Sequence, residues 1–127
     1  MKTTRLLTNI CSSKLPETRD FYVRHFGFEV AYNSDWFINL EQPDTGFEIG
    51  ILQSGHELLP ERYHSPAPRG VYLTFVVERV NQCFERASTA GVVIVQPPED
   101  TFYGQRRCLV LDPNELLIDV STPASQL

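Results

Sequence analysis

The order of helix and strand patterns repeats within the chain, and this internal repeat limits the possible folds more than any other feature. In residues 5–52 a strand pattern precedes an amphipathic helix, and three further strand patterns follow. Residues 70–121 give the same order. A unit of this size buries too little apolar surface to fold well alone, so the two units are expected to pair. The repeat therefore predicts an α+β protein built from two βαβββ modules.

End signals and apolar spacing predict one helix in each module. The first covers Leu15 to Phe26, because Pro16 is tolerated in the first turn of a helix and Gly27 suits a left-handed C-cap. The second covers Glu78 to Ala90, where apolar residues recur at helical spacing before Gly91. Each helix is expected to cover one face of its module's sheet.

Alternation along the strands separates a core face from an opposite face. The residues expected to pack under the helices are Phe47, Ile49, Ile51, Val71, Leu73, Phe75, Val77, Leu116, Ile118 and Val120. Glu48 and Asp119 lie between these apolar positions, and a carboxylate in the middle of a strand must face water, a partner or a cavity. Pro97 and Pro98 are expected to end the strand that begins at Val92.

The last hairpin carries the clearest turn signal. Its strands, Phe102–Leu111 and Leu116–Ser121, flank the sequence Asp-Pro-Asn-Glu at residues 112–115. Asp and Asn side chains bond nearby backbone groups, and Pro presets the φ angle of a corner. We therefore expect a tight turn at this point.

A proline-rich stretch, residues 54–69, is expected to connect module one, residues 1–53, to module two, residues 70–127, within a single domain of residues 1–127. Long ordered loops are often functional covers. A plain linker explains the same composition, so both interpretations stay open.

Composition and charge exclude several partners. The formal net charge is −5 and the pI is about 5.1, whereas nucleic acids and anionic membranes attract positively charged proteins. The chain has no apolar run long enough to cross a membrane and no apolar leader at its start. We therefore expect a cytoplasmic protein without a nucleic-acid or membrane partner.

Three cysteines, Cys11, Cys83 and Cys108, are odd in number and widely spaced, which matches neither a disulfide framework nor a zinc pattern. They are interpreted as small apolar residues of the core or its edge. A catalytic thiol is the alternative, although no His or acid lies in an obvious supporting motif.

Two groups of motifs carry a resemblance to a known family. The first is Leu15–Tyr22 with Phe26–Val30, and the second is Tyr103–Arg107 with Asp112–Asn114 and Leu116–Val120. Through these motifs the whole chain resembles the glyoxalase / bleomycin-resistance / extradiol-dioxygenase superfamily, also called vicinal oxygen chelate proteins. The resemblance implies curled mixed sheets with helices on their convex faces and a cavity on the concave side. It also implies a homodimer, since a second chain often completes such a cavity.

The resemblance also bears on metal binding. Enzymes of this superfamily hold a divalent metal with a His on the first strand and a Glu on the last strand of each half. The matching last-strand acids are Glu48 and Asp119. The first strands offer Leu7 or Thr8 in one half and Tyr72 in the other, so both expected imidazoles are missing. Two carboxylates alone suit zinc, nickel or iron poorly, and no metal or other cofactor is expected.

The predicted site is therefore a ligand cavity on the faces opposite the helices. The residues expected to bind the ligand are Leu7, Asn9, Trp36, Glu48, His56, Tyr72, Thr74 and Asp119. In this interpretation the two acids are polar anchors, able to accept hydrogen bonds or to pair with a cationic group. The alternative is that they are solvated acids on an open face.

The predicted function is metal-free binding of a small aromatic or cationic molecule, as in bleomycin-resistance members. One alternative is a metal-dependent lyase or dioxygenase of the same superfamily, in which His56 or His64 would reach in from the connecting stretch. Another is a metal-free enzyme with Tyr72 or a carboxylate as its acid or base.

Overall fold

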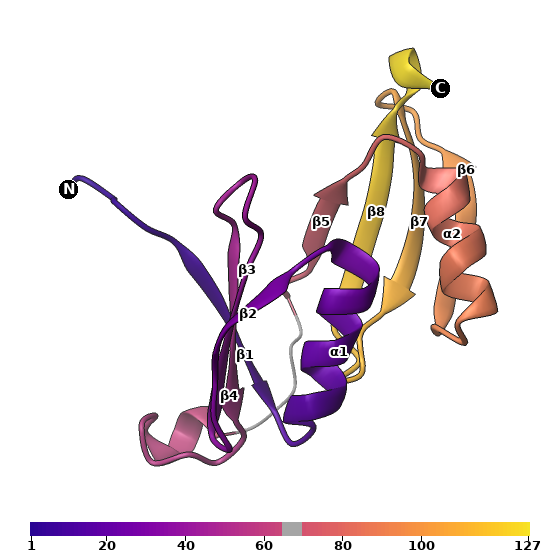
Figure 1. Ribbon diagram of the computed structural model, residues 1–127. Helices are drawn as coiled ribbons and strands as arrows, with labels where there is room; N and C mark the ends of the chain where they lie inside the picture. The colour runs from indigo at the N-terminus through magenta and orange to yellow at the C-terminus, as the bar shows by residue number, and fades with distance from the viewer. Residues whose placement is uncertain (65–69) are drawn as a thin grey trace. The chain divides into compact units, whose positions relative to one another are not determined.

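The computed structural model describes residues 1–64 and 70–127, and the chain divides into two compact units, residues 1–67 and 68–127. Within the described residues, each unit has one α-helix and one four-stranded mixed sheet, and Figure 1 shows each helix beside the sheet of its own unit. Both units have the order β-α-β-β-β. This order confirms the α+β fold class that the internal repeat predicts.

The first unit has the strand order β1-β4-β3-β2, with β1 parallel to β4 and the other pairs antiparallel. Its elements are β1 Leu7–Ser12, α1 Leu15–Phe26, β2 Glu29–Asn33, β3 Phe37–Glu41 and β4 Glu48–Gln53, followed by the 3₁₀ helix η1 Glu61–Tyr63. Helix α1 has the predicted bounds. Pro16 lies in its first turn, and Gly27 ends it in the left-handed conformation with φ 70°.

The core of this unit lies between α1 and one face of the sheet. Ile38 pairs with Ile51 and Leu40 with Ile49 across β3 and β4, and all four side chains are buried. Tyr22 of α1 is fully buried on the same side. Burying an aliphatic side chain of this size contributes about 1.5–3 kcal/mol relative to leaving it exposed. These contacts fix which face of the sheet α1 covers and which face lies opposite the helix.

The second unit repeats the arrangement with the strand order β5-β8-β7-β6, in which β5 and β8 are parallel. Its elements are β5 Leu73–Val76, α2 Val80–Thr89, β6 Ile94–Asp100, β7 Gln105–Leu111 and β8 Leu117–Pro123, followed by the 3₁₀ helix η2 Ala124–Gln126. The predicted turn joins β7 to β8. There Asp112 Oδ1 accepts hydrogen bonds from Asn114 N at 2.7 Å and Leu116 N at 2.9 Å.

Helix α2 is shorter than predicted because a buried threonine fixes its start. Thr122 Oγ1 accepts a hydrogen bond from Val80 N at 3.0 Å and donates to Val77 O at 2.8 Å. The N–H of Val77 still bonds Ser121 O, as in a strand. The strand-like pairing therefore reaches Val77, Glu78 lies in a bend, and the helix begins at Val80.

The prediction that Pro97 and Pro98 end a strand is wrong. Both prolines lie inside β6, which is an outer strand and pairs with β7. The register shifts between Gln96 and Glu99, so the ladder is irregular where the prolines lie. An outer strand with a bulge tolerates proline because it does not need every backbone N–H.

Most of the predicted core residues are buried or half-buried, but two are not. Phe47 and Val71 are each 63% exposed. They lie before the first residues of β4 and β5, where the chain has not yet entered the sheet. Alternation therefore predicts burial correctly for the core residues within the strands, and it fails for Phe47 and Val71, which precede the strands.

The described part of the predicted connection, residues 54–64, contains turns and η1. The rest of it, residues 65–69, lies outside the described residues, and the single-domain boundaries stay a prediction. Among the helices described, none combines the length and the apolar character that crossing a membrane requires.

Candidate functional site

The face of the first sheet opposite α1 carries a polar cluster centred on Glu48. Leu7 pairs with Glu48, and Asn9 pairs with Gly50, in the parallel register of β1 and β4. Asn39 of β3 lies beside Gly50 on its other side. Since side chains alternate across a strand, these residues share one face, opposite the buried Ile49. Three predicted site residues, Leu7, Asn9 and Glu48, are therefore brought together.

The Glu48 carboxylate receives hydrogen bonds on both oxygens. Arg5 Nε donates to Oε2 at 2.5 Å, Arg5 Nη2 donates to Oε1, and Asn39 Nδ2 donates to Oε1 at 3.3 Å. The hydrogen bond from Arg5 lowers the pKa of the Glu48 carboxyl and outweighs the opposite effect of burial. The Glu48 side chain is only 8% exposed, whereas that of Arg5 is 58% exposed. Sequence reasoning missed Arg5, which lies before β1.

Gly50 leaves room for the Asn9 side chain on this face. A Cβ at residue 50 would lie 2.0 Å from Asn9 Oδ1 and 3.0 Å from Phe37 Cε1. Next to it, Asn39 Oδ1 is buried and has no hydrogen-bond partner among the described residues. The face therefore presents a carbonyl oxygen that can accept a hydrogen bond.

Trp36 and His56, both predicted site residues, form an aromatic stack. Their ring centroids are 4.8 Å apart and their planes differ by 22°. Leu58 N donates to His56 Nδ1 at 3.0 Å, so the neutral imidazole carries its hydrogen on Nε2. The other predicted loop histidine, His64, hydrogen-bonds Leu59 O through Nε2 at 2.7 Å.

The face of the second sheet opposite α2 carries a cluster centred on Asp119. Thr74 pairs with Asp119 in the parallel register of β5 and β8, and its hydroxyl donates to Asp119 Oδ2 at 3.1 Å. Arg107 of β7 lies on the same face, with Nη1 3.9 Å from Oδ2. The Asp119 side chain is 8% exposed and that of Arg107 is 27% exposed. Two predicted residues, Thr74 and Asp119, thus meet an arginine that was not predicted.

Three buried polar atoms on this face have no hydrogen-bond partner among the described residues. They are Asp119 Oδ1, Arg107 Nε and Gln105 Oε1. Gln105 lies two residues before Arg107 on β7, so both side chains point to the face of Asp119. Leaving such a group unsatisfied costs about 1–3 kcal/mol, and more for a charged group. The cluster is therefore incomplete as it stands.

Tyr72 does not occupy the first-strand position that the sequence suggested. It precedes β5 and is 54% exposed. The residue beside Asp119 is Thr74, two positions later. The parity argument for Tyr72 fails because the strand starts after it.

The cysteines fit the core interpretation. Cys108 is buried, and burial raises the pKa of its thiol to about 11. Burial also raises the pKa of the Cys83 thiol, which is half-buried. A thiol with a raised pKa is a poor nucleophile near neutral pH, because the thiolate is the reactive form.

The residues of each unit do not fit the divalent metal that the resemblance implies. The described residues contain no group of three or more His, Cys, Asp or Glu side chains placed to hold a metal ion. An arginine lies at each carboxylate, Arg5 at Glu48 and Arg107 at Asp119. A guanidinium takes lone pairs that a metal would need and repels a cation. Leu7 and Thr74, the register partners of the two acids, supply no imidazole.

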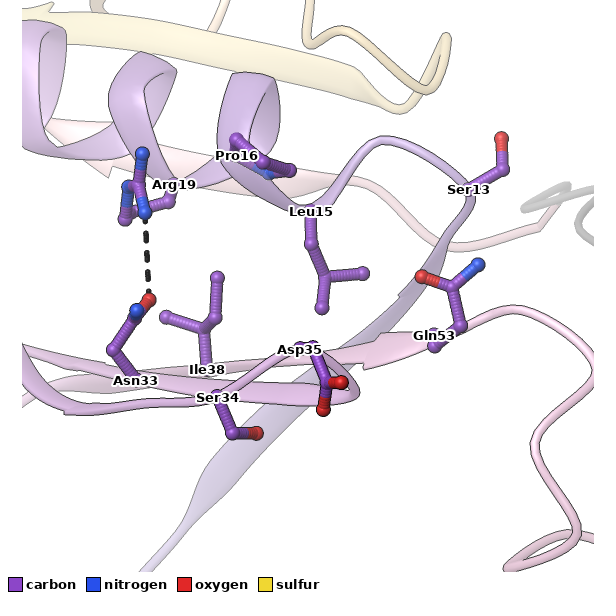
Figure 2. Close-up of a pocket in the computed structure, with 9 residues that line it drawn as sticks. All are labelled: Ser13, Leu15, Pro16, Arg19, Asn33, Ser34, Asp35, Ile38 and Gln53. Atoms are coloured by element: carbon purple, nitrogen blue, oxygen red, sulfur yellow. Dashed lines mark hydrogen bonds between the residues drawn. The ribbon is translucent and has the colours of Figure 1, made fainter.

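A separate pocket of about 440 Å³ lies on the helix side of the first sheet. Its lining residues are Ser13, Leu15, Pro16, Arg19, Asn33, Ser34, Asp35, Ile38 and Gln53. Figure 2 shows Leu15 and Ile38 pointing into the space between α1 and the sheet, and Arg19 Nη1 donating to Asn33 Oδ1 at 3.4 Å. None of the eight predicted site residues lines this pocket, because Ile38 belongs to the face opposite Glu48.

Comparison with solved structures supports the fold. A structure described as a member of the Glyoxalase/bleomycin resistance protein/dioxygenase superfamily from Sphaerobacter thermophilus DSM 20745 is 18% identical, with a TM-score of 0.76 over 95% of this chain and 98% of that chain. A structure described as a glyoxalase/bleomycin resistance protein/dioxygenase family enzyme from Burkholderia phytofirmans PsJN is 22% identical, with a TM-score of 0.79 over 92% of this chain and 96% of that chain. A protein from the mobile metagenome of V. Pseudocholerae is 25% identical, with a TM-score of 0.73 over 96% of both chains.

Comparison with protein families extends this result to the sequence. No curated protein matches the chain. A family model described as Glyoxalase/Bleomycin resistance protein/Dioxygenase superfamily matches residues 6–120, which is most of the chain. The chain therefore belongs to the Glyoxalase/Bleomycin resistance protein/Dioxygenase superfamily.

Proposed function

We propose that this protein binds a small molecule at the sheet faces opposite its helices, without a metal. The observation that carries the proposal is the incomplete hydrogen bonding around Asp119. Asp119 Oδ1, Arg107 Nε and Gln105 Oε1 are buried, and none has a partner among the described residues. A bound molecule that completes these bonds would gain about 0.5–1.5 kcal/mol for each neutral bond and about 1.5–3 kcal/mol for each bond to a charged group.

Each sheet carries its own set of side chains proposed to contact a ligand. Leu7, Asn9 and Glu48 belong to the first sheet, and Thr74 and Asp119 belong to the second. Trp36, 38% exposed, and Tyr72, 54% exposed, are accessible aromatic surfaces, and His56 stacks on Trp36. Aromatic and apolar surface around a few convergent polar groups is the usual composition of a small-molecule site.

A metal-free mode is favoured over a metal-dependent lyase or dioxygenase by the position of the arginines. Each last-strand carboxylate already has a guanidinium close to it. Elemental analysis of the gently purified protein distinguishes the two functions. A stoichiometric divalent metal that survives gel filtration would support the metal-dependent alternative and contradict the proposal.

Asp119→Asn tests the binding site directly. The substitution keeps the shape of the side chain and removes its charge, so we expect folding to be nearly unchanged. Binding of a ligand that donates to Asp119 should weaken by roughly 1–3 kcal/mol, the scale of a charge-assisted hydrogen bond. The measurement is the ligand-dependent rise in Tm, which follows the affinity through mass action, in a screen of small aromatic and polar molecules.

The matched control for this experiment is Asp100→Asn. Asp100 is 67% exposed and pairs with Arg106 on β7, the neighbour of Arg107 in sequence. Asp100→Asn should bind every ligand as the wild type does. Equal binding by wild type and Asp119→Asn would remove Asp119 from the site.

The oligomeric state is a separate part of the proposal. We expect a homodimer in the cytoplasm, as the resemblance to the superfamily implies. Light scattering at micromolar concentration measures the oligomeric state directly, and a monomer would contradict the expected homodimer.

A further inference from the structure

The chemistry around Asp119 also indicates which group the ligand presents to the second unit, provided that the proposed binding function is correct. The unpartnered atoms are two acceptors and one donor. The acceptors are Asp119 Oδ1 and Gln105 Oε1, and the donor is the N–H at Arg107 Nε. All three lie on one face of the β7–β8 pair. A matching group must therefore offer two donors and one acceptor.

The charges in the cluster argue against a charged group. Arg107 Nη1 lies 3.9 Å from Asp119 Oδ2. A cation attracted to Asp119 is therefore repelled by Arg107, and an anion attracted to Arg107 is repelled by Asp119. Glu99 of β6, the register partner of Arg107, is exposed and accepts a hydrogen bond from Gln96 Nε2 at 3.1 Å. Water screens this exposed carboxylate more than it screens the buried pair.

Apolar side chains flank the polar atoms on the same face. Leu109 pairs with Asp119, and Leu111 pairs with Leu117 one step further along β7 and β8. Val76 of β5, beside Ser121, is 66% exposed. This surface can contact an apolar ring or chain to which the polar group is attached.

We propose that the ligand presents an uncharged primary carboxamide, or a group with the same arrangement of one acceptor beside two N–H donors. Its carbonyl oxygen accepts from Arg107 Nε, and its two N–H bonds donate to Asp119 Oδ1 and Gln105 Oε1. Each unpartnered atom then gains one bond of the correct polarity. Of the small aromatic or cationic ligands expected from the sequence, this favours an uncharged aromatic one, since Arg107 balances the charge of Asp119.

Three probes with the same ring test this assignment: benzamide, benzoate and benzylammonium. The readout is the NMR signal of the Arg107 Nε–H group in the full-length, ¹⁵N-labelled protein. We expect benzamide to shift this signal and to half-saturate at a concentration about tenfold lower than the other two, the difference that one lost charge-assisted bond gives.

Arg107→Lys and Arg106→Lys provide a matched pair of variants. Arg107→Lys keeps the positive charge and removes the Nε–H donor, so benzamide binding should weaken about tenfold. Arg106 is the next residue along β7, faces the other way and binds Asp100. Arg106→Lys should leave benzamide binding unchanged. Because Arg107→Lys removes the Arg107 Nε–H signal, the backbone amide signals of Gln105 and Asp119 report benzamide binding in both variants, and the rest of the backbone spectrum reports folding.

The outcomes separate this inference from the proposed function. Preferential binding of benzoate or benzylammonium at the same Arg107 signal would overturn the carboxamide assignment and leave small-molecule binding intact. The same conclusion follows if Arg107→Lys and Arg106→Lys weaken benzamide equally. If none of the probes shifts a signal from Gln105, Arg107 or Asp119, both the assignment and binding at this sheet are wrong.

Discussion

The two sheets carry an acid at matching places on their last strands, but the two carboxylates have different surroundings. Both oxygens of Glu48 are hydrogen-bonded by Arg5, and Asn39 adds a further bond. Asp119 has one oxygen bonded by Thr74 and the other without a partner among the described residues. Matching backbone positions therefore produce a completed ion pair in one unit and an incomplete one in the other.

The position of each cation on the chain explains this difference. Arg5 lies in the exposed segment before β1, where its backbone is outside the strand and its side chain can approach the carboxylate side-on, through Nε and Nη2. Arg107 is held within β7, and its nearest recorded approach to Asp119 is 3.9 Å. The strand fixes the Cα position of Arg107, so the register of β7 and β8 limits how closely its guanidinium can approach the Asp119 carboxylate. The second unit therefore has the stronger requirement for an outside partner.

The largest expected effect tests whether the separate cores of the two units contribute equally to stability. Ile51 and Ile118 are fully buried on the helix-facing sides of β4 and β8. Replacing either with Ala should lower the free energy of unfolding by about 2–5 kcal/mol, because a cavity adds to the loss of apolar burial. Urea denaturation measures both values. The exposed Val95 gives a control in which the same kind of truncation should have little effect. A small loss at only one isoleucine would show that the two scaffolds are not equivalent.

An intermediate effect is expected where a hydroxyl joins a strand to a helix. Thr122→Val would leave Val80 N and Val77 O without their recorded partner, at a cost of roughly 1–3 kcal/mol for each buried group left unsatisfied. Thr122→Ser keeps the hydroxyl and should recover most of the stability in the same denaturation assay. In the first unit Ser12 Oγ accepts from Lys14 N at 2.9 Å, so both units use a hydroxyl near the start of the helix. A loss for Thr122→Ser as large as that for Thr122→Val would show that the methyl group of Thr122 contributes as much as its hydroxyl, and would contradict the dominant role of the hydroxyl.

The smallest effect concerns the completed pair in the first unit and depends on pH. The hydrogen bond from Arg5 lowers the pKa of the Glu48 carboxyl below its ordinary value of 4.5. A carboxyl with a lowered folded-state pKa contributes stability above its unfolded pKa, and this contribution is lost as the pH falls through the folded pKa. Arg5→Gln should therefore reduce stability at neutral pH, and its difference from wild type should shrink as the pH falls below 4.5.

Arg106 also lowers the pKa of the Asp100 carboxyl. Because the wild type and Arg5→Gln both contain this pair, its pH-dependent contribution cancels from the difference in stability between them. Urea unfolding of the two proteins across a pH series gives the difference directly. A difference that stays constant on acidification would mean that Arg5 acts through packing and not through the charge of Glu48.

Local signals in the sequence were sufficient for the scaffold. Pro16 and Gly27 predicted α1 to the residue, because helix ends depend on nearby backbone geometry. Alternation correctly separated Glu48 from Ile49 and Asp119 from Ile118. The same alternation misplaced Tyr72, because the point where a strand enters a sheet depends on its neighbours.

The partners of the two acids depended on the fold itself. Arg107 follows from the register of β7 and β8, which the turn after Leu111 sets, so counting back from that turn could have found it. Arg5 could not be found this way, since its side chain reaches Glu48 from outside any strand. The pocket beside Arg19 was equally inaccessible to pattern analysis, because it arises where α1 packs over the β2–β3 turn.

The two prolines of β6 have a consequence for the protein in concentrated solution. An outer strand normally offers a row of N–H and C=O groups on which a strand of another molecule can add, which is how ordered aggregates grow. Successive residues of a strand direct their N–H groups to opposite sides, so adjacent prolines remove a donor from each side. Pro97 and Pro98, next to a shift in register, therefore interrupt the ladder that an incoming strand would need along β6. The feature that concealed this strand in the sequence also protects its edge from fibril-like extension.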